Sequence, residues 1–173
     1  YINVHNWLFT SRGIPVLFYG SEVGFMTGAR EHEGGRNYFG AKRIAEAADH
    51  PIHQSLTRIA KVRQESVALQ RGLQLNLEFT QHTAAFLRVY EHQGINQTAL
   101  VLLNKGDESA KFVLSEHLNA GVWQEALSGN QRRVLNGQTQ RFTLPGNSVQ
   151  VWLINAPTTD PATINELKQL QLL

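Results

Sequence analysis

The chain has 173 residues, of which 42% are hydrophobic and 17% are charged, a balance typical of a folded globular protein. Sixteen basic and fourteen acidic residues leave a formal charge of +2, which is too small to indicate a nucleic-acid partner. The absence of cysteine excludes disulfides and thiolate metal sites. No apolar run reaches the roughly 20 residues that a membrane-spanning helix needs, so we expect no membrane partner.

In chain order, the first element is predicted to be a helix over residues 1–11 that ends before Gly13. The stretch GIPVLFYGSE, residues 13–22, then contains an unbroken apolar and aromatic run from Val16 to Tyr19. Such a run indicates a strand buried on both faces, as in a parallel sheet. On pattern alone, an ordinary buried strand without functional meaning is an equal alternative. Because a parallel strand without neighbours leaves its backbone groups unpaired, we infer a fragment or one piece of a split protein.

Residues 23–50 are rich in glycine, charged residues and histidine, and a connection of this length is usually functional. A helix is predicted to follow, with Asp49 as its N-cap, Pro51 in its first turn and its end near Gly72. Its apolar face is expected to carry Ile52, Leu56, Ile59, Val62 and Leu69. The opposite face is interpreted as solvated surface, with Arg58, Lys61, Arg63, Gln64 and Glu65.

From residue 73 the periodicity becomes that of strands, and turn signals divide the following eighty residues or so into short segments. The predicted strands are Leu75 to Thr80, Ala84 to His92, Thr98 to Asn104, Ala110 to Leu114, Val122 to Ala126, Arg132 to Leu135, Gln140 to Leu144 and Val149 to Ile154. This spacing indicates an antiparallel sandwich with Greek-key connections, in which ALVLLN is the central strand. The tail after Pro157 is either a short docked helix beginning at Asp160 and Pro161 or a poorly ordered end.

GIPVLFYGSE resembles the G-x-P-x-x-x-Y-G-x-E segment of the α-amylase family of glycoside hydrolases, with matches at Gly13, Pro15, Tyr19, Gly20 and Glu22. The run EVGFMTGAREHEGGRNYFG is similar to that family's eighth βα-loop, and its MTG is especially similar to cyclodextrin glucanotransferases and related bacterial amylases. The resemblance implies an α+β fragment in three parts. These are the last α-β-α segment of a TIM (β/α)8 barrel over residues 1–72, the antiparallel Greek-key β-sandwich called domain C over 73–156, and a tail over 157–173.

The resemblance also implies that the parent enzyme cleaves or transfers α-1,4-linked glucose units with retention, using two carboxylates roughly 5 Å apart. In the family, these carboxylates and a third essential Asp lie on barrel strands that would precede Tyr1. We therefore assign no catalytic residue, including Glu22, and expect the chain alone to be inactive. The implied partners are an α-glucan or maltooligosaccharide and the upstream barrel segment. No cofactor is expected in this chain, calcium is left open for the rest of the parent, and a periplasmic or secreted location is favoured.

Two loop residues are candidates for substrate binding, Arg36 and His32. Arg36 aligns with the Arg of an Asp-Pro-x-x-Arg element that binds a sugar in the glucanotransferase branch, but Glu31-His32-Glu33 stands where Asp-Pro is expected. A guanidinium fork suits sugar hydroxyls, although an ion pair that orders the loop is an equal alternative. A metal site at these residues and His50 is not expected, because regular ligand spacing is missing.

Aromatic residues leave two further questions open. Tyr38 and Phe39 form either a sugar-stacking platform or an anchor for the loop, and Trp123 and Trp152 are either core residues or an exposed sugar-binding pair. A non-catalytic carbohydrate-binding module is therefore the main alternative function. A third possibility is an interaction protein that docks through Leu167 and Leu170 of its C-terminal helix.

Overall fold

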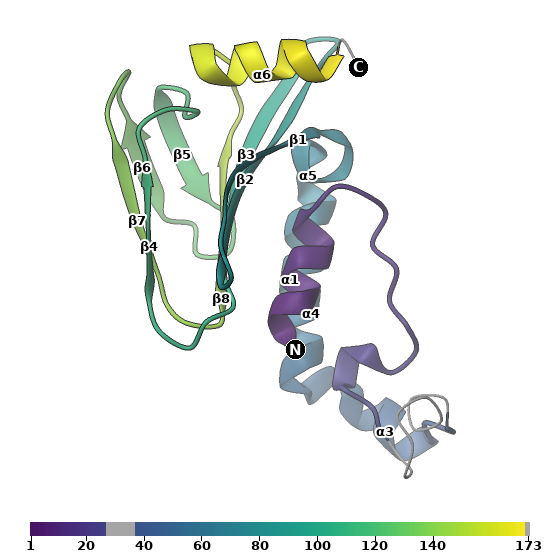
Figure 1. Cartoon of the computed structure of the whole chain (residues 1–173). Coiled ribbons are helices and arrows are strands. Elements are labelled where there is room, and N and C mark those ends of the chain that lie inside the picture. The colour runs from purple at the N-terminus through teal and green to yellow at the C-terminus, as the bar shows by residue number, and fades with distance from the viewer. Residues whose placement is uncertain (27–36, 172–173) are drawn as a thin grey trace.

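The computed structural model describes residues 1–26 and 37–171. A β-sandwich lies beside a layer of helices, and α1 and α4 run next to each other along one face of the sandwich (Figure 1). The helices are α1 (Ile2–Thr10), η1 (Ser21–Val23), α3 (Ala41–Glu46), η2 (Ala47–Asp49), α4 (Pro51–Glu65), α5 (Val67–Arg71) and α6 (Pro161–Gln171). Among the described residues, no helix has the length and apolar character needed to cross a membrane.

The strands are β1 (Leu73–Phe79), β2 (Thr83–His92), β3 (Ile95–Asn104), β4 (Ala110–Leu114), β5 (Gly121–Glu125), β6 (Gln131–Val134), β7 (Gln140–Leu144) and β8 (Ser148–Ile154). They form a six-stranded sheet in the order β1-β2-β3-β8-β5-β6 and a two-stranded sheet of β4 and β7, and all the strand pairs in them are antiparallel. The eight predicted strands are confirmed. So is the central position of ALVLLN, because β3 pairs with both β2 and β8.

Two apolar clusters occupy the two faces of the larger sheet. One lies between the two sheets and contains Leu87, Leu100, Phe112, Phe142 and Trp152 among others. The other lies between the larger sheet and the helices, where residues of α4 and α5 pack against alternate residues of β2 and β3. The sheet is therefore covered on both sides, which explains why consecutive residues through most of β2 and β3 are buried.

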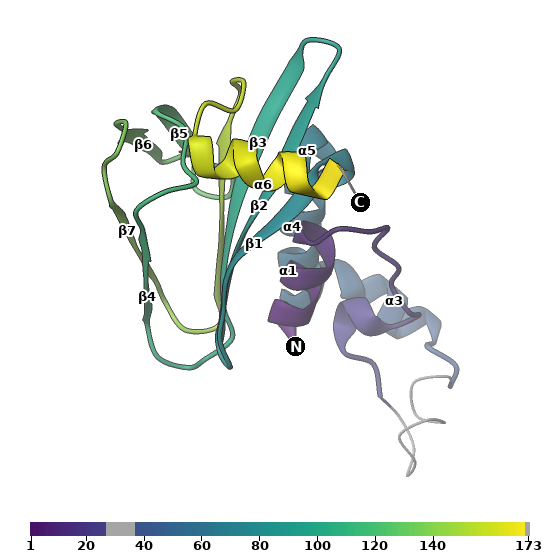
Figure 2. The same ribbon diagram turned by 45° about the horizontal axis from the view of Figure 1, so that its top comes forward.

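The strand predicted within residues 13–22 is not formed in the described chain, so this prediction is not confirmed. After α1 the backbone loops out beside the helices and returns to α4 at η1, without strand pairing (Figures 1 and 2). Ile14 is 88% exposed, Val16 76% and Phe18 57%. A strand needs a neighbouring strand to pair its backbone N–H and C=O groups, and the described residues offer none here. The apolar side chains that predicted burial are instead at the surface.

The helix predicted from residue 51 to residue 72 is interrupted at Ser66. The Ser66 hydroxyl accepts a hydrogen bond from the N–H of Leu69 at 3.2 Å and donates one to the Oε1 of Gln97 at 2.7 Å. A serine that caps the following turn favours a new helix start over continuation. The N-cap of α4 is His50 rather than the predicted Asp49, because the Nδ1 of His50 accepts from the N–H of Ile52.

The assignment of Arg63 to a solvated face was also wrong. Its side chain is 8% exposed, and it donates to the carbonyls of Phe9, Ser11 and Gly13 at 3.0, 3.2 and 2.6 Å. Arg88 on β2 is 1% exposed and donates to the carbonyls of Thr10 and Gly72. We call Arg63 and Arg88 the arginine clamp. It joins the C-terminal end of α1 to α4 and to the sandwich.

Of the two alternatives for the tail, the docked helix is the one observed. Leu167 of α6 packs against the core between the sheets, whereas Leu170 is 43% exposed. Figure 2 shows α6 lying across the end of the sandwich next to β1, β2 and β3. Of the two leucines that an interaction protein was expected to use for docking, Leu167 is therefore already packed within the chain.

Candidate functional site

An aromatic cluster forms the base of the predicted functional loop. Tyr19, Phe25 and Phe39 contact one another edge to face, with ring centroids 5.0 to 6.1 Å apart. Phe25 and Phe39 are 8% and 5% exposed. Such edge-to-face contacts fix ring positions as well as burying area. The cluster therefore holds together the chain on both sides of residues 27–36.

Hydrogen bonds complete this base. The Tyr19 hydroxyl accepts from the N–H of Phe39 at 2.7 Å and donates to the carbonyl of Asn37 at 3.4 Å. Gly20 has φ of +80°, and a Cβ at this position would lie 2.7 Å from the Cβ of Phe25. Both the backbone conformation and the contact with Phe25 therefore require glycine at the turn that follows Tyr19.

A positively charged side chain covers the outer side of the cluster. The guanidinium of Arg43 on α3 lies 5.2 Å from the centroid of the Phe25 ring and donates to the carbonyl of Phe39. Next to it is a cavity of about 260 Å³, which Arg43, Glu46, His50, Phe25 and Met26 help to line. This arrangement can orient a loop and offer polar groups beside an apolar surface. Among the described residues, no group of three or more His, Asp or Glu could hold a metal ion.

Both predicted substrate-binding residues, Arg36 and His32, lie outside the described residues, as do Glu31 and Glu33. Their roles stay predictions. The two neighbouring aromatic residues differ in burial: Phe39 is a buried anchor, whereas Tyr38 is 84% exposed. The anchoring alternative is therefore correct for Phe39, and Tyr38 is accessible from solvent.

Glu22, which we did not expect to be catalytic, lies half-buried in η1. The negative charge of Glu22 acts on His5 of α1, which is 4% exposed. Burial lowers the pKa of His5, and the negative charge of Glu22 opposes part of this effect. The Nδ1 atom of His5 has no hydrogen-bond partner among the described residues. Sequence reasoning missed His5 because a lone histidine in a helix carries no distinguishing pattern.

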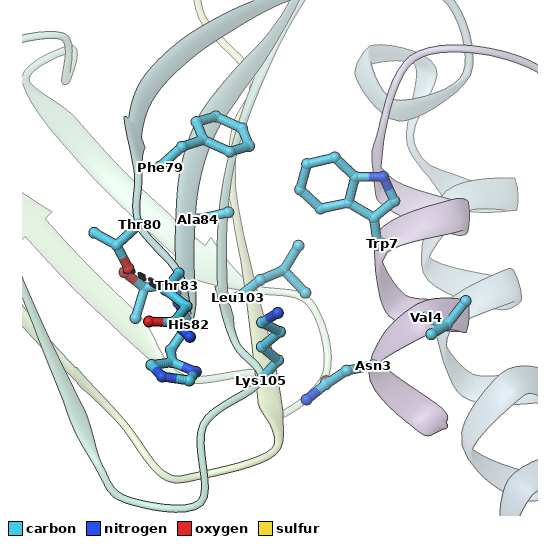
Figure 3. Close-up of a pocket in the computed structure, with 11 residues that line it drawn as sticks. Asn3, Val4, Trp7, Phe79, Thr80, His82, Thr83, Ala84, Leu103 and Lys105 are labelled. Carbon is cyan, nitrogen blue, oxygen red and sulfur yellow. Dashed lines mark hydrogen bonds between the residues drawn. The ribbon is translucent and has the colours of Figure 1, made fainter.

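A second hollow lies between α1 and the turn that joins β1 to β2 (Figure 3). It has a volume of about 320 Å³. Trp7 and Phe79 face each other across it at 5.6 Å with an interplanar angle of 83°, and they are 40% and 47% exposed. We call this hollow the Trp7 recess. Lys105 and His82 supply polar groups at its edge.

The two tryptophans of the sandwich are core residues. Trp123 is 2% exposed and donates its indole N–H to the carbonyl of Asn119, and Trp152 is 6% exposed. Trp152 also packs against Phe142, with Arg132 lying over both rings. They do not form the exposed pair that a sugar-binding module was expected to use.

Comparison with known proteins gives matches over most of the chain. A cyclomaltodextrin glucanotransferase from Bacillus sp. (strain 1-1) is 28% identical over 160 residues, which are 89% of this chain and 21% of that protein. An α-amylase from Anoxybacillus and one from Geobacillus thermoleovorans, the latter in complex with acarbose, each superpose with a TM-score of 0.72 at 23% identity. They cover 91% of this chain, which corresponds to 32% and 33% of those chains. The chain is similar to α-amylase family enzymes in sequence and in fold.

A γ-cyclodextrin glucanotransferase from alkalophilic Bacillus clarkii also superposes, with a TM-score of 0.64 at 25% identity over 90% of this chain and 23% of that chain. No family model matches. The chain spans about a fifth of the length of the curated relatives it matches. The resemblance drawn from residues 13–22 is therefore confirmed at the level of the family, and so is the α+β class with antiparallel sheets. The barrel strand and the Greek-key connections stay predictions.

Proposed function

We propose that the chain is the C-terminal part of a retaining α-glucan-active glycoside hydrolase or transglycosylase. In this assignment, residues 1–72 complete the barrel, the sandwich stabilises it, and the loop at residues 27–36 forms one wall of the sugar cleft. Catalysis itself requires two carboxylates that an upstream segment supplies. The substrates are starch or maltooligosaccharides.

The exposed apolar segment after α1 is the observation that carries this assignment. Ile14, Val16 and Phe18 are more than half exposed, yet they lie between α1 and the anchored base of the loop. When parallel strands flank such a segment, as in a barrel, its backbone N–H and C=O groups are paired and its apolar side chains are buried. The similarity to glucanotransferases and amylases supports the same assignment.

Activity measurements on the chain and on its parent test this function. The 173-residue chain should show no hydrolysis or transfer on starch or maltooligosaccharides, and clear turnover by the purified chain would overturn the assignment. The sequence that precedes Tyr1 in the source protein should encode a barrel of several hundred residues. In that parent, Arg36→Ala should lower kcat/KM by about 10- to 100-fold, because it removes charge-assisted hydrogen bonds to the sugar. The exposed Arg58→Ala on α4 is the matched control and should leave kcat/KM unchanged.

A carbohydrate-binding module without chemistry is the second candidate, and the Trp7 recess is the observation that favours it. Trp7 and Phe79 offer apolar ring surface next to polar side chains, which is the composition of a small-molecule site. Their rings are nearly perpendicular, so only one of them can stack on a given sugar ring. For this function, the chain alone should be retained on immobilised amylose, and Trp7→Ala should abolish the retention.

A further inference from the structure

A third hollow lies at the opposite end of the sandwich from the Trp7 recess. It is lined by the loop between β4 and β5, the turn between β6 and β7, and residues 159–161 at the start of α6, and we call it the α6 hollow. Figure 1 shows these three segments gathered at the same end of the sandwich. The volume is about 680 Å³, within the range of roughly 300 to 1,000 Å³ that is usual for small-molecule sites.

One wall of the α6 hollow is fixed by hydrogen bonds to a buried side chain. Asn119 is 3% exposed, and its Oδ1 accepts from the N–H groups of Thr159 and Asp160 at 2.8 and 3.0 Å. Its Nδ2 donates to the carbonyl of Pro157 at 3.3 Å. Asp160 in turn caps α6 by accepting from the N–H of Thr163 at 2.8 Å. This wall therefore needs no ordering when a ligand binds, which reduces the entropic cost of binding.

The lining combines an apolar floor with neutral and acidic polar groups. Leu114 and Leu118 are buried at 7% and 9% exposure, while Glu116, Asn136 and Gln138 are exposed. In the described part of the chain, the side-chain amides of Asn136 and Gln138 form no hydrogen bond with another residue. No Lys or Arg is among the described lining residues, so a phosphate or carboxylate ligand would find no counter-charge. Amides and a carboxylate match hydroxyl groups, which both donate and accept.

We propose that the α6 hollow binds a neutral saccharide of one or two rings, with hydroxyls on Glu116, Asn136 and Gln138 and an apolar ring face towards Leu114 and Leu118. That this saccharide is α-linked glucose rests on the proposed function. The site lies beside α6, at the far end of the molecule from α3 (Figure 1), so it holds substrate without taking part in bond cleavage.

The test is a titration of the 173-residue chain with maltose, followed through the backbone amides by NMR. Saturable shifts are expected at Ala120, Gly137 and Thr159, with a Kd of about 1 to 10 mM for so small a ligand. Gln138→Ala should weaken binding by about fivefold or more, because it removes a hydrogen bond to the sugar. Gln131→Ala, on an exposed position of the adjacent β6, is the matched control and should leave the Kd unchanged.

Absence of saturable shifts around the α6 hollow up to about 50 mM maltose and cellobiose, well above the expected Kd, would overturn the proposal. Shifts at the Trp7 recess alone, or a Kd that Gln138→Ala leaves unchanged, would overturn it too. Binding of the β-linked cellobiose in preference to maltose would support a saccharide site while counting against the α-glucan assignment of the parent. The two proposals can therefore fail separately.

Discussion

At the scale of single residues, the arginine clamp has a direct energetic consequence. Burial of a guanidinium is costly unless its donors are satisfied, and the clamp satisfies them with main-chain carbonyls at the C-terminal end of α1. That end of a helix carries partial negative charge, which favours a cation. Burial lowers the pKa of Arg88 to about 10, with smaller contributions from the positive charges of Arg63 and Arg12, so Arg88 is still protonated at neutral pH.

Replacement of Arg63 by Lys keeps the charge and removes the planar fork that reaches three carbonyls. We expect Arg63→Lys to lower the free energy of unfolding by about 1–3 kcal/mol, because buried acceptors lose their donors. Urea denaturation measures this value. The control is Arg58→Lys on the exposed face of the same helix, which should change stability by less than about 0.5 kcal/mol. Equal effects of the two substitutions would show that the clamp does not stabilise the fold.

The buried His5 predicts a pH dependence of stability. Burial lowers its pKa in the folded chain below the unfolded value of about 6.5, so the unfolded chain binds the proton more readily. The contribution of His5 to stability is therefore complete above about pH 6.5 and decreases as the pH falls towards its folded pKa. In His5→Gln, the slope of unfolding free energy against pH in this window should be flatter by up to about 1.4 kcal/mol per pH unit. A slope unchanged in His5→Gln would contradict the prediction.

At the scale of elements, α6 is held to the sandwich by one side of its surface. Leu167 packs against the core between the sheets, while Leu170 is 43% exposed. We expect Leu167→Ala to cost about 1–3 kcal/mol of stability and to speed hydrogen exchange throughout α6. Leu170→Ala should change stability by less than about 0.5 kcal/mol. If Leu170→Ala instead abolished an assembly seen with the wild-type chain, α6 would serve a partner protein as well.

The β-strands show how far local pattern determines this fold. All eight were predictable because each is bounded by turn residues, and because ALVLLN is apolar on both faces and occurs in the sheet centre. The segment at residues 13–22 was not predictable in the same way, since whether it pairs depends on other strands. Arg63 was misassigned because its acceptors belong to residues 9–13, some fifty positions earlier in the chain. The predicted substrate-binding roles of Arg36 and His32 stay predictions, because both residues fall outside the described residues.

At the scale of the whole molecule, the apolar side chains of residues 14–19 form an exposed hydrophobic patch. Exposed apolar patches of this kind promote association in the absence of the surface that covers them. We expect the 173-residue chain to associate in a concentration-dependent manner, measured by light scattering coupled to size-exclusion chromatography. Val16→Ser combined with Phe18→Ser should reduce this association. Val113→Ser combined with Val122→Ser, at separate positions that are 55% and 52% exposed, should not. A wild-type chain that is monomeric at all concentrations would contradict the expectation.

The arginine clamp has a consequence for how this region tolerates sequence change. Every acceptor of Arg63 and Arg88 is a main-chain carbonyl, an atom that all amino acids share. No side-chain replacement at the acceptor positions removes these oxygens, so the hydrogen bonds themselves constrain the two arginines, whereas Gly13 and Gly72 are constrained by their backbone surroundings. In a saturation mutagenesis screen for folded protein, Arg63 and Arg88 should each tolerate few replacements, whereas Ser11 should accept many. Compensating pairs of substitutions, the usual trace of contacts between two side chains, should be absent between the arginines and their acceptor positions.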